Sequence, residues 1–122
     1  MKKVILIVED DPKNQLLFRD LLQSHDYATL DANNGKKGVE LAKRKKPDLV
    51  LMDIMMPVMT GIEAVKILKA TPETKNIPVL ALTSFAMPEE QKTIIEAGFD
   101  GYMIKPLDIH LLLKKIAEYL QP

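Results

Sequence analysis

The sequence contains no cysteine among its 122 residues. Disulfides, thiolate chemistry and cysteine-ligated metals are therefore excluded, and a reducing, cytoplasmic compartment is favoured. The chain also has no net charge, because 17 lysines and arginines balance 17 aspartates and glutamates. This balance argues against a binder of nucleic acid or of acidic membranes. Any function that depends on charge must come from a local cluster.

Long apolar runs are missing as well. No segment approaches the roughly 20 apolar residues of a membrane span. The apolar run at residues 4–8 is too short for a signal peptide and stops at Glu9. Repeats, low-complexity segments and linkers are also lacking. Nearly half of the residues are hydrophobic, so we expect one compact domain over residues 1–122.

Five short runs rich in valine, isoleucine and leucine predict buried strands. They cover residues 4–8, 28–30, 49–52, 79–82 and 102–104. Amphipathic stretches between and after them predict helices, which begin after Asp11, after Asn34, near Gly61, near Pro88 and at Asp108. Regular alternation of strands and helices is typical of a parallel sheet covered by helices on both faces. The chain is too short for an eight-fold barrel, so an open doubly wound α/β sheet is expected.

Polar side chains follow four of the five predicted strands. Glu9, Asp10 and Asp11 follow the first, Asp53 the third, Thr83 and Ser84 the fourth, and Lys105 the fifth. Open parallel sheets place their ligand sites at the carboxyl ends of the strands, so these groups should converge. Clustered carboxylates repel one another unless they share a proton or bind a cation. Oxygen ligands of this kind favour Mg²⁺, and a phosphate group would complete its coordination.

Asp53 is the best candidate nucleophile, because a carboxylate can form an acyl phosphate. Taken singly, each residue has a plainer interpretation. Asp11 is expected to cap a helix, and for Asp10 or Asp53 alone capping and metal binding are equally good interpretations. The four methionines at 52, 55, 56 and 59 are expected to pack in the core and loops. The combination of groups at four strand ends favours the phosphoryl site.

The same residues resemble the receiver domain of two-component response regulators over essentially the whole chain. Four stretches carry the likeness: VILIVEDD at 4–11, PDLVLMDIMMP at 47–57, ALTS at 81–84 and YMIKP at 102–106. The resemblance implies a flavodoxin-like (βα)5 fold with strand order 2-1-3-4-5. The sequence departs from the family's pattern at Glu9, where the family commonly has aspartate, and at Thr60, where an aspartate often precedes the glycine.

By this resemblance, Asp53 is the phosphoacceptor. The metal ligands implied are Asp10, Asp53, the Met55 carbonyl and, through water, Glu9. Thr83 and Lys105 bind the phosphoryl oxygens, and the bond before Pro106 is cis. Tyr102 matches the aromatic that changes rotamer with Thr83 on activation, which reshapes the face of the fourth helix, fifth strand and fifth helix.

The resemblance also implies partners. With no output domain after the last helix, the chain is similar to single-domain regulators of cell division and sporulation phosphorelays, switched by phosphorylation rather than acting as enzymes. A sensor histidine kinase or histidine phosphotransferase and a downstream protein target are expected, with the chain a monomer or weak dimer. Candidate docking residues are Asn14, Leu17, Phe85, Pro106 and Leu107, although Leu17 could instead belong to the core.

Three rival hypotheses remain. A magnesium phosphatase of the haloacid dehalogenase type also uses a strand-end aspartate, but it needs a second aspartate where this chain has Met55. A flavodoxin-like nucleotide module needs a phosphate-binding loop rich in Ser, Thr and Gly, whereas the first strand is followed by three acidic residues. The third is a receiver that has lost phosphorylation.

Overall fold

The computed structural model describes residues 2–84 and 87–120, and within these ranges five strands alternate with five helices. The strands are β1 (Val4–Val8), β2 (Ala28–Ala32), β3 (Leu49–Asp53), β4 (Val79–Thr83) and β5 (Gly101–Ile104). The helices are α1 (Pro12–Ser24), α2 (Gly35–Lys45), α3 (Gly61–Ala70), α4 (Pro88–Ala97) and α5 (Ile109–Leu120). In the described ranges no helix has both the length and the apolar character that crossing a membrane requires.

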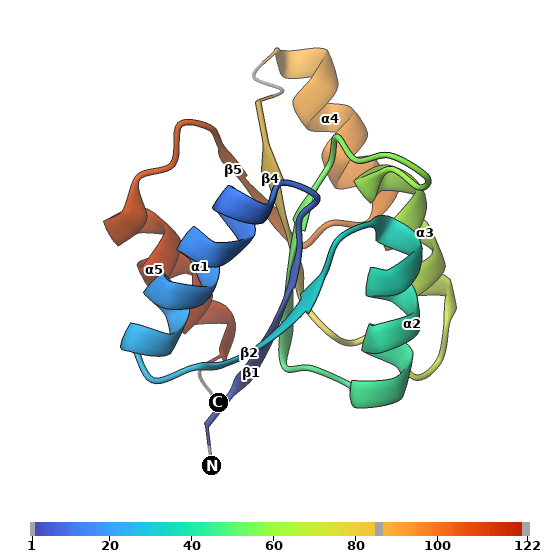
Figure 1. The fold of residues 1–122 in the computed structure, drawn as a ribbon. Helices are drawn as coiled ribbons and strands as arrows, with labels where there is room; N and C mark the ends of the chain where they lie inside the picture. Colours follow the sequence, from blue (N-terminus) through green and yellow to red (C-terminus); the bar gives the residue numbers. More distant parts are fainter. Residues whose placement is uncertain (1, 85–86, 121–122) are drawn as a thin grey trace.

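The five strands form one parallel sheet in the order β2-β1-β3-β4-β5. Helices α1 and α5 cover one face, and α2, α3 and α4 cover the other (Figure 1). The predicted doubly wound fold with strand order 2-1-3-4-5 is therefore confirmed. The order reverses between β1 and β3, where ligand sites of such sheets are found.

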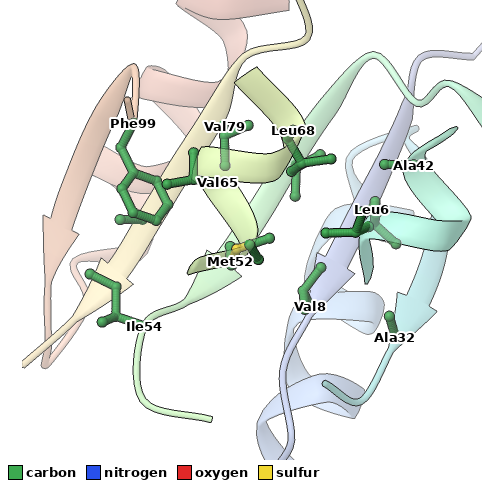
Figure 2. Packing of buried hydrophobic residues seen from close by; sticks show 14 of the residues in the cluster. Leu6, Val8, Ala32, Ala42, Met52, Ile54, Val65, Leu68, Val79 and Phe99 are labelled. Atoms are coloured by element: carbon green, nitrogen blue, oxygen red, sulfur yellow. The ribbon is translucent and has the colours of Figure 1, made fainter. Parts of the chain in front are cut away.

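The central strands β1, β3 and β4 are apolar except for Asp53 and Thr83 at their ends, because both faces of the sheet are buried. Successive side chains of a strand point to opposite faces. Leu6 and Val8 of β1 therefore join the core under α2, α3 and α4, whereas Ile5 and Ile7 join the core under α1 and α5. Figure 2 shows part of the first core, including Met52 of β3.

Three helices begin with the side-chain caps that the sequence suggests. The Asp11 carboxylate accepts a hydrogen bond from the Lys13 amide at the start of α1, with Pro12 at the first helical position. The Asn34 side chain accepts from the Lys37 amide in α2. At α3, Thr60 and Glu63 form a reciprocal capping box. The departure from the family at Thr60 therefore retains helix capping.

Several element ends differ from the sequence prediction. Strand β2 extends to Ala32 rather than Leu30, and β3 and β4 each extend by one residue to include Asp53 and Thr83. The backbone continues to pair because neighbouring strands offer partners: Asp53 lies opposite Leu82, and Thr83 lies opposite Ile104. Both polar residues therefore sit on rigid strand backbone rather than on loops.

A lysine joins three segments at the amino-terminal end of the sheet. The Lys69 ammonium of α3 donates to the Asp100 carboxylate at 2.8 Å and to the Ile77 carbonyl at 2.9 Å. The same Asp100 oxygen accepts from the Val79 amide at the start of β4. These bonds connect α3 with both loops that lead into β4 and β5.

Replacement of Lys69 by methionine is expected to destabilise the fold by about 1–3 kcal/mol, because the partly buried Asp100 carboxylate loses its charged partner. Denaturant unfolding, followed by circular dichroism, measures this loss. Lys66→Met, an exposed position on the same helix, is the matched control and should change the free energy of unfolding by about 0.5 kcal/mol or less. Equal effects of the two substitutions would contradict the role of Lys69.

Candidate functional site

Three carboxylates meet at the carboxyl end of β1 and β3. Oxygens of Glu9, Asp10 and Asp53 all lie within 4.8 Å of one another. Glu9 follows β1 directly, and its amide donates to the Ala32 carbonyl, which fixes the loop against β2. The sequence prediction that these strand ends converge is therefore confirmed.

Glu9 is the most unusual member of this cluster because its side chain is buried. Only 2% of the residue is exposed. One carboxylate oxygen, Oε2, accepts from the Asp11 amide, but Oε1 is buried and has no hydrogen-bond partner among the described residues. Loss of hydration raises the pKa of Glu9 to about 7, and the negative charge of Asp53 adds to this rise. A cation would relieve both the desolvation and the repulsion.

Asp53 is held between an amide and an ammonium group. Its Oδ1 accepts from the Met55 amide at 3.2 Å, and its Oδ2 lies 3.4 Å from the Lys105 Nζ. The same ammonium lies 3.9 Å from Glu9 Oε1. Lys105 is thus the nearby positive charge that partly offsets the carboxylates.

Thr83 and Lys105 lie side by side at the carboxyl ends of β4 and β5. Thr83 is 1% exposed, and its carbonyl accepts from the Lys105 amide at 2.7 Å. Thr83 is one residue beyond Leu82, which pairs with Asp53 across the strands. The peptide bond between Lys105 and Pro106 is cis, as the resemblance implied.

The loop from β3 to α3 passes very close to the Asp53 backbone. A Cβ atom on Gly61 would lie 2.5 Å from the Asp53 carbonyl oxygen, so only glycine fits. The Gly61 amide donates to the Ile54 carbonyl and closes the loop. Val58 adopts a φ of 71° and is 79% exposed. A β-branched residue in this left-handed region is strained, which no sequence signal had indicated.

The methionines only partly follow the packing expectation. Met52 and Met56 are buried, and Met59 packs on the core. Met55, however, is 61% exposed, because it projects from the loop just after Asp53. The phosphatase hypothesis requires an acid–base residue at this position, and the thioether of Met55 cannot serve as one.

An apolar groove of about 230 Å³ lies beside Lys105, between α1 and the segment that leads into α5. Four of the five predicted docking residues line it: Asn14, Leu17, Pro106 and Leu107. Leu17 is 56% exposed, so the alternative that it belongs to the core is wrong. The fifth, Phe85, lies outside the described residues.

Tyr102 lies in β5, which β4 separates from β3 and its Asp53. It is half-buried in β5, and its phenol donates to the Gln91 side chain of α4 at 2.9 Å. The sequence singled out Tyr102 but not Gln91. Hydrogen bonds between side chains on different elements leave no periodic signal that a sequence pattern could reveal.

Comparison with known proteins agrees with this geometry. The family model described as response regulator receiver domain matches residues 5–117. The polar-differentiation response regulator DivK of Brucella anthropi is 40% identical over 98% of both chains. Among solved structures, the chemotaxis protein CheY4 of Vibrio cholerae superposes with a TM-score of 0.91 at 29% identity, over 98% of this chain and all of that one.

A second solved structure bears on the acidic cluster. The receiver domain of a Pseudomonas aeruginosa sensor histidine kinase has a TM-score of 0.91 and 29% identity, and 98% of each chain is covered. That protein is described with a magnesium ion coordinated in its active site cleft. The cluster of Glu9, Asp10 and Asp53 is compatible with magnesium, because it offers carboxylate oxygens and one of them, Glu9 Oε1, is buried with no hydrogen bond to any described residue.

The fold and the family match define a signalling module of the α/β class. The chain belongs to the response regulator receiver family of two-component signalling. Its likeness to DivK extends over essentially the full length of both proteins.

Proposed function

We propose that this chain is a phosphoacceptor response regulator whose Asp53 receives a phosphoryl group in a magnesium-dependent reaction. The observation that carries the proposal is the position of Asp53. Its carboxylate lies within 4.8 Å of two other carboxylates and 3.4 Å from the Lys105 ammonium. Carboxylates that can hold a cation, together with an ammonium group, are the groups that phosphoryl transfer needs.

In the proposed reaction an Asp53 carboxylate oxygen forms a bond to phosphorus. The phosphorus–nitrogen bond of a phosphohistidine breaks, and its electron pair stays on the imidazole. Bound Mg²⁺, held by Asp10, Asp53, the Met55 carbonyl and a water on Glu9, would supply neutralising charge. Lys105 and the Thr83 hydroxyl bind the transferred oxygens. The result is a signalling event on the protein itself rather than turnover of a substrate.

The surface around Lys105 indicates which proteins this chain would bind. The apolar groove beside Lys105 accepts a helix of a histidine kinase or histidine phosphotransferase, which brings the phosphohistidine over Asp53. Exposed Leu17 and the wall of Pro106 and Leu107 give that groove its apolar character. After transfer, Thr83 moves toward the phosphoryl group, Tyr102 changes rotamer, and the face of α4, β5 and α5 binds a cytoplasmic target protein.

Mass spectrometry of the intact protein tests the proposal. Incubation with Mg²⁺ and acetyl phosphate is expected to add one phosphoryl group to the intact protein. Asp53→Asn should abolish the adduct because an amide is a poor nucleophile, and chelation of magnesium should abolish it in the wild type. Asp48→Asn is the matched control, because Asp48 caps the Val4 amide away from the cluster and should leave labelling intact.

An adduct that persists in Asp53→Asn would overturn the assignment of the acceptor. Multiple turnover of a small phosphate ester, with no stable adduct, would favour the phosphatase instead.

A further inference from the structure

The phenol of Tyr102 has a specific partner on a neighbouring element. It donates a 2.9 Å hydrogen bond to Oε1 of Gln91, which lies in the second turn of α4. The Tyr102 ring also packs on the core that α4 shares with α2 and α3. A half-buried phenol needs such a partner, because an unpaired polar group in a poorly hydrated place is costly.

The position of Tyr102 connects this bond to the acidic site. Tyr102 pairs with Ala81 in β4, two residues before Thr83 at the strand end. On its other side Tyr102 borders a surface hollow of about 360 Å³ with Leu111 of α5. Tyr102 therefore belongs to the face proposed to bind targets and lies on the strand next to the one that carries Thr83.

We infer that Gln91 is a positioning residue that holds Tyr102 against α4 and so opposes the phosphorylated conformation. The inference rests on the proposed function, in which Tyr102 changes rotamer when Thr83 moves toward the phosphoryl group. A rotamer that carries the ring away from α4 breaks the bond to Gln91, and we assign that rotamer to the phosphorylated conformation. A ligand that selects the conformation without the bond must offset its loss, so the Gln91–Tyr102 bond sets the balance between the two states.

The expected size of the effect follows from the net contribution of one neutral hydrogen bond. Removing the bond should raise the population of the activated conformation about 2- to 10-fold. Two substitutions remove it from opposite ends: Gln91→Met, which keeps the length of the side chain, and Tyr102→Phe, which keeps the ring. If they act through one bond, the second adds nothing in the presence of the first.

The test uses beryllofluoride with Mg²⁺ as a phosphoryl mimic on the full chain, with binding followed by NMR. Gln91→Met and Tyr102→Phe should each tighten apparent beryllofluoride affinity about 2- to 10-fold, and adding Tyr102→Phe to Gln91→Met should change the affinity no further. Lys92→Met, at an exposed neighbour on α4, should leave the affinity unchanged. Thermal unfolding of each variant checks that it is folded.

The outcomes distinguish failure of the role of Gln91 from failure of the proposed function. If wild type binds beryllofluoride but both single variants bind it with unchanged or weaker affinity, the role of Gln91 is wrong and the proposed function stands. Additive effects in the double variant would also exclude action through a shared bond. If folded wild type with magnesium does not bind beryllofluoride, both proposals fail.

Discussion

Replacement of Lys105 by methionine is expected to slow phosphorylation of Asp53 by acetyl phosphate about 100-fold. The Lys105 ammonium lies 3.4 Å from Asp53 and 3.9 Å from Glu9. It is therefore placed to stabilise negative charge on the transferred oxygens, and methionine keeps the length of the side chain without the charge. Time courses of intact mass at saturating Mg²⁺ give the rate.

Magnesium binding should respond in the opposite direction to the same substitution. Loss of a positive charge from the site removes a repulsion, so Lys105→Met should bind Mg²⁺ at least as tightly as wild type by calorimetry. Lys115→Met is the matched control: it removes a partly buried lysine of α5 and leaves Lys105 in place. A wild-type rate of labelling would exclude Lys105 from the reaction, and loss of magnesium binding would show that the variant had rearranged the site.

Gly61→Ala is expected to cost stability and labelling together. The added Cβ would lie 2.5 Å from the Asp53 carbonyl oxygen and 2.8 Å from the Ile54 Cα, and backbone atoms cannot move aside as a flexible side chain can. We expect a destabilisation of about 2–3 kcal/mol and at least a tenfold slower labelling of Asp53, because the acceptor backbone must shift. Denaturant unfolding and mass time courses measure the two effects.

The neighbouring cap supplies the matched control for this glycine. Thr60→Ala removes the capping box of α3 and should cost about 1 kcal/mol, yet it places no atom against Asp53. Its labelling rate should therefore stay close to wild type under conditions where both proteins are folded. If Thr60→Ala slows labelling as much as Gly61→Ala does, loss of stability rather than displacement of Asp53 explains the effect.

The sequence predicted most of the fold because local signals agree with one another. Asp11, Asn34 and Thr60 each precede an amphipathic stretch and cap a helix. The apolar runs are short and flanked by polar residues, which indicates buried strands. The convergence of Glu9, Asp10 and Asp53 then follows from the topology alone, since parallel strands share one carboxyl edge.

Other features depend on tertiary packing and leave no such signal. The burial of Glu9, whose Oε1 accepts no hydrogen bond from the part of the chain that the structure describes, arises from the surrounding strands. The extra residues of β3 and β4 reflect pairing with neighbouring strands rather than local preference. The left-handed backbone at Val58 contradicts the preference of a β-branched residue and is imposed by the loop that returns to Gly61.

The two hydrophobic cores separate the groove beside Lys105 from Tyr102. The groove beside Lys105 rests on Phe18 and Leu112, which belong to the core under α1 and α5. Tyr102 packs on the opposite core, and the sheet lies between them. In the proposed function, substitutions of Asn14 or Leu17 on α1 therefore alter the choice of histidine kinase without touching the core on which Tyr102 packs. A duplicated copy of this protein can then acquire a new upstream partner while keeping its old output.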